Sequence, residues 1–104
     1  MARFDVYPHP EVARRSTTPF LVDVQNNFID RVASRVVIPM RHAAAFGPRM
    51  RDLNPLFEVS GKNVVLDTAA LAAFPAAGLK KPVASLLAQR EDIVAALDTL
   101  FGSY

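Results

Sequence analysis

The pattern of apolar positions is clearest at the carboxy-terminal end of the chain, over residues 86–104. Apolar side chains recur there at the three- and four-residue spacing of one helical face, at Leu86, Ile93, Leu97, Leu100 and Phe101. Polar and charged residues fall mostly on the other side, and alanines add helix propensity. Ser85 is the expected N-cap, and Gly102 is the expected stop because glycine tolerates positive φ. The pattern therefore predicts a terminal helix.

Residues 20–25 give the strongest strand signal in the rest of the chain. Their alternation predicts that Leu21 and Asp23 face one way and the apolar residues beside them face the other. Residues 4–7 and the β-branched run 35–40 predict two more strands. Pro39 lies inside the second of these, and because proline donates no ladder hydrogen bond, it predicts an edge strand or a bulge.

A β-hairpin is predicted where residues 56–59 and 64–67 flank the turn-forming residues 60–63. The alanine-rich residues 71–79 are consistent with either a short strand or an irregular crossing. Many short strands closed by one helix predict a single domain, residues 1–104, that is mainly β. We expect a small antiparallel sheet or barrel that carries a carboxy-terminal helix.

Composition narrows the class of protein. No apolar run approaches the ~20 residues that span a bilayer, and the amino terminus has no apolar segment typical of a secretory signal. Cysteine is absent, which excludes disulfides and thiol nucleophiles and fits a reducing cytoplasm. The net charge is +2, and the arginines are scattered rather than interleaved with aromatic residues. We therefore expect a cytoplasmic protein that contacts neither a membrane nor nucleic acid directly.

Candidate catalytic and metal-binding groups are few. The chain has two histidines, His9 and His42, each in a predicted loop and without the spacing of metal ligands. We interpret both as solvated loop side chains and expect no metal and no cofactor. Serine and threonine residues lack a nucleophile elbow, and four scattered glycines form no phosphate loop. From the residues alone, the prediction is a small β-rich binding protein rather than an enzyme.

Several segments, taken in order, resemble the CcdB family of toxins. They are the first strand at residues 4–7, the run Leu-Val-Asp-Val-Gln at 21–25 followed by Ile29-Asp30, the run Val-Val-Ile-Pro at 36–39, and the terminal helix. The resemblance extends nearly from end to end. It implies an SH3-like small barrel with an extra small sheet and a carboxy-terminal helix, as in CcdB and MazF-like toxins.

The resemblance also implies a function. CcdB-like proteins are homodimeric toxins of type II toxin–antitoxin systems, and they are not enzymes. They bind the A subunit of DNA gyrase and trap its cleaved complex with DNA. A cognate CcdA-like antitoxin with a disordered carboxy-terminal segment neutralises them. We expect the same target and the same partner here.

The implied gyrase-binding residues are Phe28, Ile29, Asp98, Phe101, Gly102, Ser103 and Tyr104. The family ends in Trp-Gly-Ile, and the tryptophans of two protomers bracket a gyrase arginine. This chain has no tryptophan and ends in Gly102-Ser103-Tyr104. Tyrosine also offers a ring face to a guanidinium, so Tyr104 is our candidate for the missing contact.

Two further surfaces follow. An apolar stripe of this length on a small barrel predicts a dimer interface at Ile93, Leu97, Leu100 and Phe101. Arginines suit the carboxylates of an acidic antitoxin segment, so two arginine-bearing loops predict antitoxin contacts at Arg14, Arg15, Arg49 and Arg51.

Two rival functions remain open. A MazF-like toxin cleaves RNA with a base, an acid and a phosphate-binding arginine, for which Arg14, Arg41 and His42 are the candidates. The other rival is a non-toxic relative that only binds an antitoxin.

Overall fold

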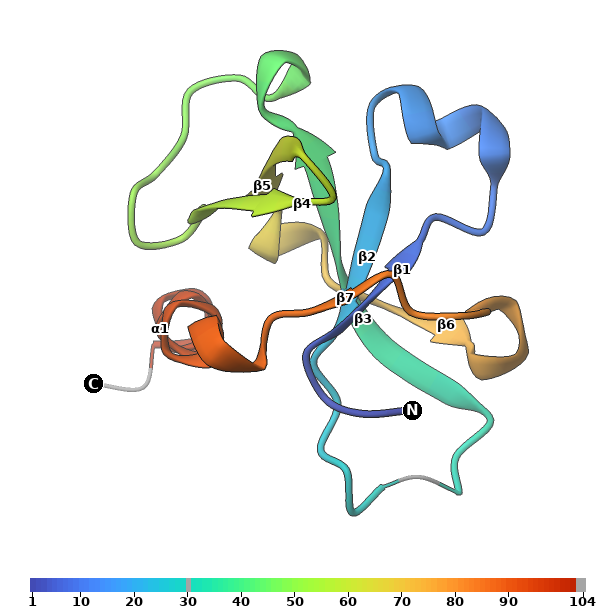
Figure 1. Ribbon diagram of the computed structural model, residues 1–104. Helices are drawn as coiled ribbons and strands as arrows, with labels where there is room; N and C mark the ends of the chain where they lie inside the picture. The colour runs from blue at the N-terminus through green and yellow to red at the C-terminus, as the bar shows by residue number, and fades with distance from the viewer. Residues whose placement is uncertain (30, 103–104) are drawn as a thin grey trace.

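The computed structural model describes residues 1–29 and 31–102, and these form a mainly β fold with one α-helix at the carboxy-terminal end (Figure 1). The strands are β1 (Asp5–Pro8), β2 (Phe20–Asp23), β3 (Ser34–His42), β4 (Leu56–Val59), β5 (Lys62–Leu66), β6 (Ala72–Pro75) and β7 (Ala84–Ser85). The helix α1 spans Arg90–Phe101. Short 3-10 helices lie at Val12–Ser16, Ala43–Ala45, Thr68–Ala70, Ala76–Gly78 and Leu87–Gln89.

The strands pair in the order β4-β5-β3-β2-β1-β7, and β6 pairs with β3. Every pairing is antiparallel. The result is a nearly closed, barrel-like sheet with α1 beside it (Figure 1). The predicted fold class is therefore confirmed.

The alternation along β2 sorts its side chains onto two faces of the sheet, as the sequence predicts. Phe20 and Val22 join the larger core cluster, which also receives Ile93 from α1. Leu21 points the other way, into a smaller cluster with Tyr7. Both faces of β2 are thus buried, which explains why its polar member, Asp23, needs a partner inside the protein.

The position of Pro39 corrects the prediction of an edge strand or bulge. β3 is the most connected strand, with β2 on one side and both β5 and β6 on the other. On that second side, β6 pairs with residues 34–37 and β5 with residues 40–42. Pro39 sits where one partner gives way to the next, and its carbonyl accepts from the N–H of Asp67 at 2.9 Å. Its missing donor therefore costs the sheet no ladder bond.

The β4–β5 hairpin is confirmed, with a tighter turn than expected. Ser60 and Gly61 alone connect the strands, with φ values of 51° and 77°. Positive φ at both central residues is the signature of a type I′ turn, whose twist matches that of the strands it joins. Lys62 and Asn63, which we expected in the turn, belong to β5.

Two connecting segments contain short regular elements, and the prediction that His9 is solvated is wrong. Residues 71–79, left open above, contain β6, which pairs with the first half of β3. Residues 8–19 contain the 3-10 helix Val12–Ser16. His9 is not a solvated side chain, because it is only 4% exposed and lies edge-on to Phe74 at 5.9 Å between ring centroids.

The terminal helix is shorter at its start than its pattern suggests. Ser85 does not cap α1, since its hydroxyl accepts from the N–H of Leu87 at the start of a 3-10 turn. Gly102 ends the helix as predicted, with φ 67° and ψ 57°. Ile93 and Ala96 face the barrel and are fully buried, so this face anchors α1 to its own core.

Candidate functional site

A buried ion pair lies beneath the segment that joins β2 to β3. Arg35 Nε donates to Asp23 Oδ2 at 2.7 Å, and the two side chains are 2% and 0% exposed. Arg35 Nη2 also approaches Asp23 Oδ2, at 2.6 Å, but without hydrogen-bond alignment. Burial raises the pKa of Asp23, and the hydrogen bond from Arg35 opposes that effect. The pair joins the end of β2 to the start of β3.

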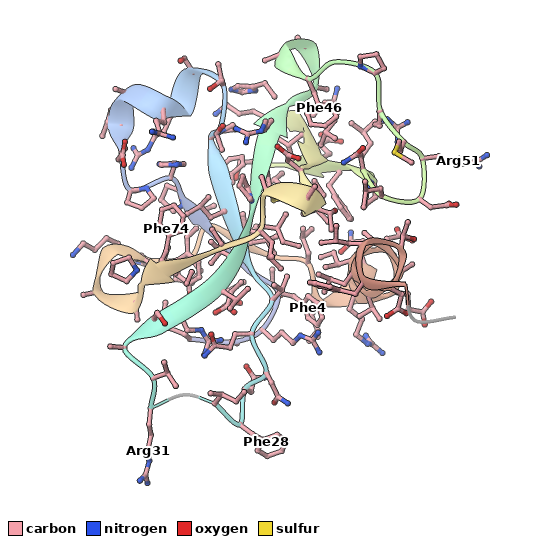
Figure 2. All side chains as sticks on the ribbon, turned by 180° about the vertical axis from the view of Figure 1, so that it is seen from behind. Phe4, Phe28, Arg31, Phe46, Arg51 and Phe74 are labelled. Atoms are coloured by element: carbon pink, nitrogen blue, oxygen red, sulfur yellow. The ribbon has the colours of Figure 1, made fainter. Side chains whose placement is uncertain are left out.

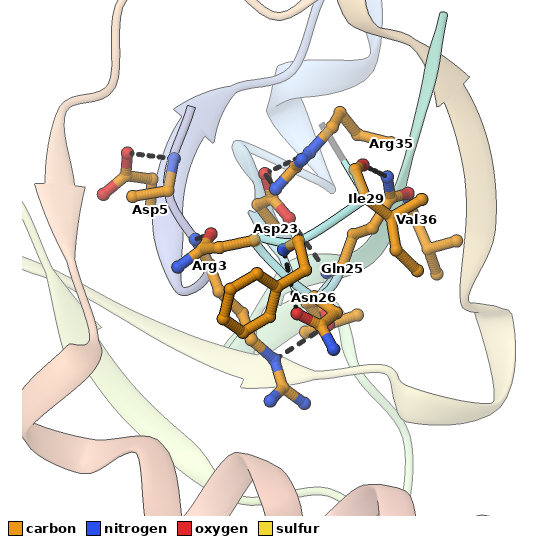
Figure 3. A network of polar contacts seen from close by, with 12 residues as sticks. Arg3, Asp5, Asp23, Gln25, Asn26, Ile29, Arg35 and Val36 are labelled. Atoms are coloured by element: carbon orange, nitrogen blue, oxygen red, sulfur yellow. Dashed lines mark hydrogen bonds and ion pairs between the residues drawn. The ribbon is translucent and has the colours of Figure 1, made fainter. Parts of the chain in front are cut away.

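Gln25 continues this network outward, toward the turn. Its N–H donates to Asp23 Oδ1 at 2.9 Å. Its side chain is used at both ends, because Oε1 accepts from the N–H of Val36 at 2.9 Å and Nε2 donates to the carbonyl of Ile29 at 2.6 Å (Figure 3). One side chain thus connects the strand β3 to the far end of the turn.

The turn itself, residues 26–29, is what we call the display turn. The N–H of Ile29 donates to the carbonyl of Asn26 at 3.0 Å, and the N–H of Phe28 donates to Asn26 Oδ1 at 2.9 Å. From outside the turn, the N–H of Arg3 donates to Asn27 Oδ1 at 2.7 Å. An Asx-type bond together with a closed turn restricts the backbone of these four residues.

The display turn carries the most exposed large apolar side chain of the described residues. Phe28 is 96% exposed, and Figure 2 shows its ring pointing away from the body of the molecule. Ile29 is also exposed. An aromatic ring held in water by an ordered backbone is a recurrent feature of protein-binding surfaces, because little conformational entropy is lost when a partner covers it.

A second group of exposed side chains lies at the end of α1. Phe101 is 68% exposed, Asp98 is exposed, and the N–H of Gly102 donates to the carbonyl of Asp98 at 2.8 Å. The predicted residues Ser103 and Tyr104 lie outside the described residues. In the part of the chain that the structure covers, no hydrogen bond or ion pair joins the display turn to α1, and Figure 1 shows them as separate features. A partner that uses both must span them.

The family profile described as CcdB protein matches residues 3–102 of this chain. The chain belongs to the CcdB family. This membership makes it a relative of the toxins of toxin–antitoxin systems. The barrel-like sheet and carboxy-terminal helix are consistent with the CcdB fold. Of the residues that the structure describes, none forms a helix long and apolar enough to cross a membrane.

The residues that we expected at a CcdB-type dimer interface differ in how exposed they are. Ile93 is wholly buried in its own core and is not available to a second protomer, which corrects that assignment. Leu97 packs partly against the core and Leu100 is half-buried. Phe101 is exposed, as is Val94, which the sequence prediction did not include. Val94, Leu97 and Phe101 form one line along α1 at spacings of three and four.

The four arginines expected to contact an antitoxin are not brought together by any contact in the structure. Arg14 pairs with Glu11 at 2.9 Å, and both are well exposed. Arg15 Nε donates to the carbonyl of His9 at 2.7 Å, and Arg49 Nη1 donates to that of Asn54 at 3.1 Å. Arg51 points outward in Figure 2. Each arginine still presents N–H donors toward solvent.

The residues considered for RNA cleavage form no catalytic set. Arg41 is held by Asp67 at 2.6 Å and by Thr18 Oγ1 at 2.7 Å, so its guanidinium links parts of the fold. His42 borders an open depression of about 540 Å³ with Ser16, Asn63 and three alanines. The described residues place no carboxylate in that lining. The depression therefore lacks the acid, base and arginine set of a ribonuclease.

Sequence reasoning missed the residues that hold the display turn, namely Arg3, Asp23, Gln25 and Arg35. One signal was available, because Asp23 shares a strand face with apolar Leu21 and a buried acid needs a cation. Which of the scattered arginines supplies that cation depends on strand register, which the chain alone does not specify.

Proposed function

We propose that this CcdB-family protein is a toxin that binds the A subunit of DNA gyrase and traps the cleaved gyrase–DNA complex. The proposed form is a homodimer, and a CcdA-like antitoxin is the proposed neutralising partner. The observation that carries the proposal is the exposed Phe28 on the display turn, at the position where the resemblance expects contact with gyrase. The match to the family over residues 3–102 supports the same assignment.

The side chain of Phe28 is suited to contact a partner rather than to stabilise the fold. Its ring is almost wholly exposed, so removing it takes nothing from the core of the free protein. The cost of leaving apolar area in water is offset only when another surface covers it. Hydrogen bonds within the display turn and from Gln25 order the backbone that carries this ring. Phe101 and Asp98 at the end of α1 provide the second proposed contact.

The RNA-cleaving alternative has less support. Of its three candidate residues, Arg14 and Arg41 each already pair with a carboxylate. A non-toxic relative that only binds an antitoxin would not require an exposed phenylalanine on an ordered turn. The gyrase proposal accounts for the exposed phenylalanine and requires no catalytic set, so it ranks first.

Direct binding to the purified gyrase A subunit tests the proposal. We expect Phe28→Ala to weaken binding by about thirtyfold, the effect of losing a typical interface hot spot of about 2 kcal/mol. Val12→Ala is the matched control, because Val12 is 71% exposed on a different part of the fold. Both variants should melt within a few degrees of the wild type. Equal affinity of Phe28→Ala and Val12→Ala would remove the display turn from the gyrase contact.

A further inference from the structure

Gln25 occupies a position that neither the core nor the exposed surface explains. It is half-buried. Both polar atoms of its amide bond to the backbone, one on each side of the β2–β3 connection. Oε1 accepts from Val36, which belongs to the ordered strand β3, whereas Nε2 donates to Ile29 in the display turn.

The two hydrogen bonds of this amide therefore have different roles, one toward β3 and one toward the display turn. The bond to Val36 is made within a region already fixed by the antiparallel ladder, since the N–H of Val24 donates to the carbonyl of Val36 at 3.0 Å. The bond to Ile29 is different, because it is the contact through which the interior polar network reaches the carbonyl at the far end of the turn. Without it, the turn would depend on local bonds from Asn26 and on the contact from Arg3.

We infer that Gln25 is a positioning residue that holds the display turn in the shape in which Phe28 and Ile29 meet a macromolecular partner. This inference rests on the proposed function for the identity of that partner, and it assigns the turn's order to a residue that touches no partner itself. The buried pair Asp23–Arg35 fixes the base of Gln25 through the 2.9 Å bond from its N–H to Asp23 Oδ1. The ion pair thus positions Gln25, and Gln25 in turn positions the display turn.

The chemistry of the amide separates this role from a general contribution to stability. Glutamate keeps the oxygen that accepts from Val36 but replaces the donor to Ile29 with a second acceptor. Gln25→Glu should therefore keep the bond to β3 and lose the bond to the turn. Gln25→Met has similar length and loses both. The chain's other glutamine, Gln89, lies exposed just before α1, so Gln89→Glu adds the same charge away from the turn.

Three measurements on the chain of residues 1–104 test the inference: amide hydrogen exchange, urea unfolding and affinity for the gyrase A subunit. In Gln25→Glu we expect exchange at Phe28 and Ile29 to rise at least about fivefold, the effect of losing one hydrogen bond, while Val36 stays protected. Affinity should fall by about fivefold to tenfold, because only the ordered fraction of the turn binds. The urea midpoint of Gln25→Glu should stay near that of Gln89→Glu. Gln25→Met loses both bonds and should also lower the urea midpoint.

Two results would overturn the inference. Unchanged exchange at Phe28 and Ile29 in Gln25→Glu would show that the turn is ordered without this bond. Raised exchange with undiminished gyrase affinity would show that the order does not serve binding. If the wild-type protein fails to bind gyrase, the proposed function falls, and the exchange measurement still decides whether Gln25 holds the turn.

Discussion

Arg35 and Asp23 form an ion pair 2.7 Å from Nε to Oδ2, and both side chains are almost completely removed from solvent. This pair is the innermost member of the polar network that leads to the display turn (Figure 3). A buried pair contributes little net stability compared with apolar residues of the same shape, but breaking it leaves an uncompensated group inside the protein. The network therefore depends on both partners being present.

The first prediction concerns that dependence. Arg35→Met and Asp23→Asn should each lower the free energy of unfolding by about 3 to 5 kcal/mol. The double variant should lose less than the sum, because it removes both buried charges. Urea unfolding of the four proteins in this cycle gives the coupling. Strictly additive losses, or single losses below about 1 kcal/mol, would contradict the account of a buried and mutually dependent pair.

The second prediction concerns pH and His9. Burial lowers the pKa of His9 from its ordinary value of 6.5, nearby Glu11 opposes this effect, and Arg14, Arg15 and Arg41 add to it. Its Nδ1 accepts from the N–H of Glu11 at 3.0 Å, a bond that the protonated ring cannot accept. Because the folded-state pKa is the lower one, the contribution of His9 to stability is complete above pH 6.5. It is lost as the pH falls from there through the folded-state pKa.

A variant isolates this contribution. In His9→Asn, the side-chain oxygen replaces Nδ1 as acceptor and the titrating group is gone. We expect a lower melting temperature at all pH values, because the contact with Phe74 is lost, and a flatter decline of stability below pH 6.5. An undiminished slope in unfolding measurements across that range would show that other groups cause the acid sensitivity.

Some of the fold is readable from the sequence because local pattern decides it. The alternation along β2, the β4–β5 hairpin and the glycine stop of α1 depend on residues adjacent in the chain. Pro39 and His9 were misjudged because their surroundings come from distant segments. Pro39 is tolerated because β5 and β6 share one side of β3, and His9 is buried by Phe74 of β6.

The residues of the candidate site were likewise predicted only in part from the sequence. Phe28, Ile29 and Phe101 were named from the family resemblance, and the structure places all three at the surface. Ile93 was misassigned because the phase of a helix relative to its own core cannot be told from its apolar stripe alone. The network under the turn was missed because it joins residues that only the register of β2 and β3 brings together.

The third prediction concerns the proposed dimer. Phe101→Glu should shift the protein toward monomer, because a charge would replace the exposed end of the apolar line on α1. Val12→Glu, at a side chain of similar exposure elsewhere, is the control and should leave association unchanged. Sedimentation equilibrium at micromolar concentration measures both. A wild-type protein that sediments only as a monomer would refute the dimer itself.

The fourth prediction concerns the terminal tyrosine, which lies outside the described residues. A ring that accepts an arginine of gyrase contributes about 1 to 2 kcal/mol, with the upper value for a fully desolvated contact. Tyr104→Ala should therefore weaken gyrase binding by about fivefold to thirtyfold and leave the melting temperature unchanged. A chain that ends at Phe101 should show at least the same loss. Unchanged affinity in both would confine the contact to Phe28, Ile29 and Asp98.

The fifth prediction concerns the antitoxin. Changing Arg14, Arg15, Arg49 and Arg51 together to glutamate should weaken antitoxin binding by more than about tenfold, since charge-assisted hydrogen bonds contribute about 1.5 to 3 kcal/mol. Reversal of Lys80 and Lys81, which lie outside both arginine-bearing loops, is the control. Calorimetric titration with the antitoxin's carboxy-terminal segment gives the affinities. A change of less than twofold in the four-arginine variant would end this proposal.

The most direct test of the central claim is the accumulation of cleaved DNA. Purified protein is incubated with gyrase, supercoiled DNA and ATP, and in a parallel reaction with RNA alone. The account predicts trapped, cleaved DNA that increases with toxin concentration and is strongly reduced in Phe28→Ala, while the RNA stays intact. RNA fragments without trapped cleaved DNA would contradict it.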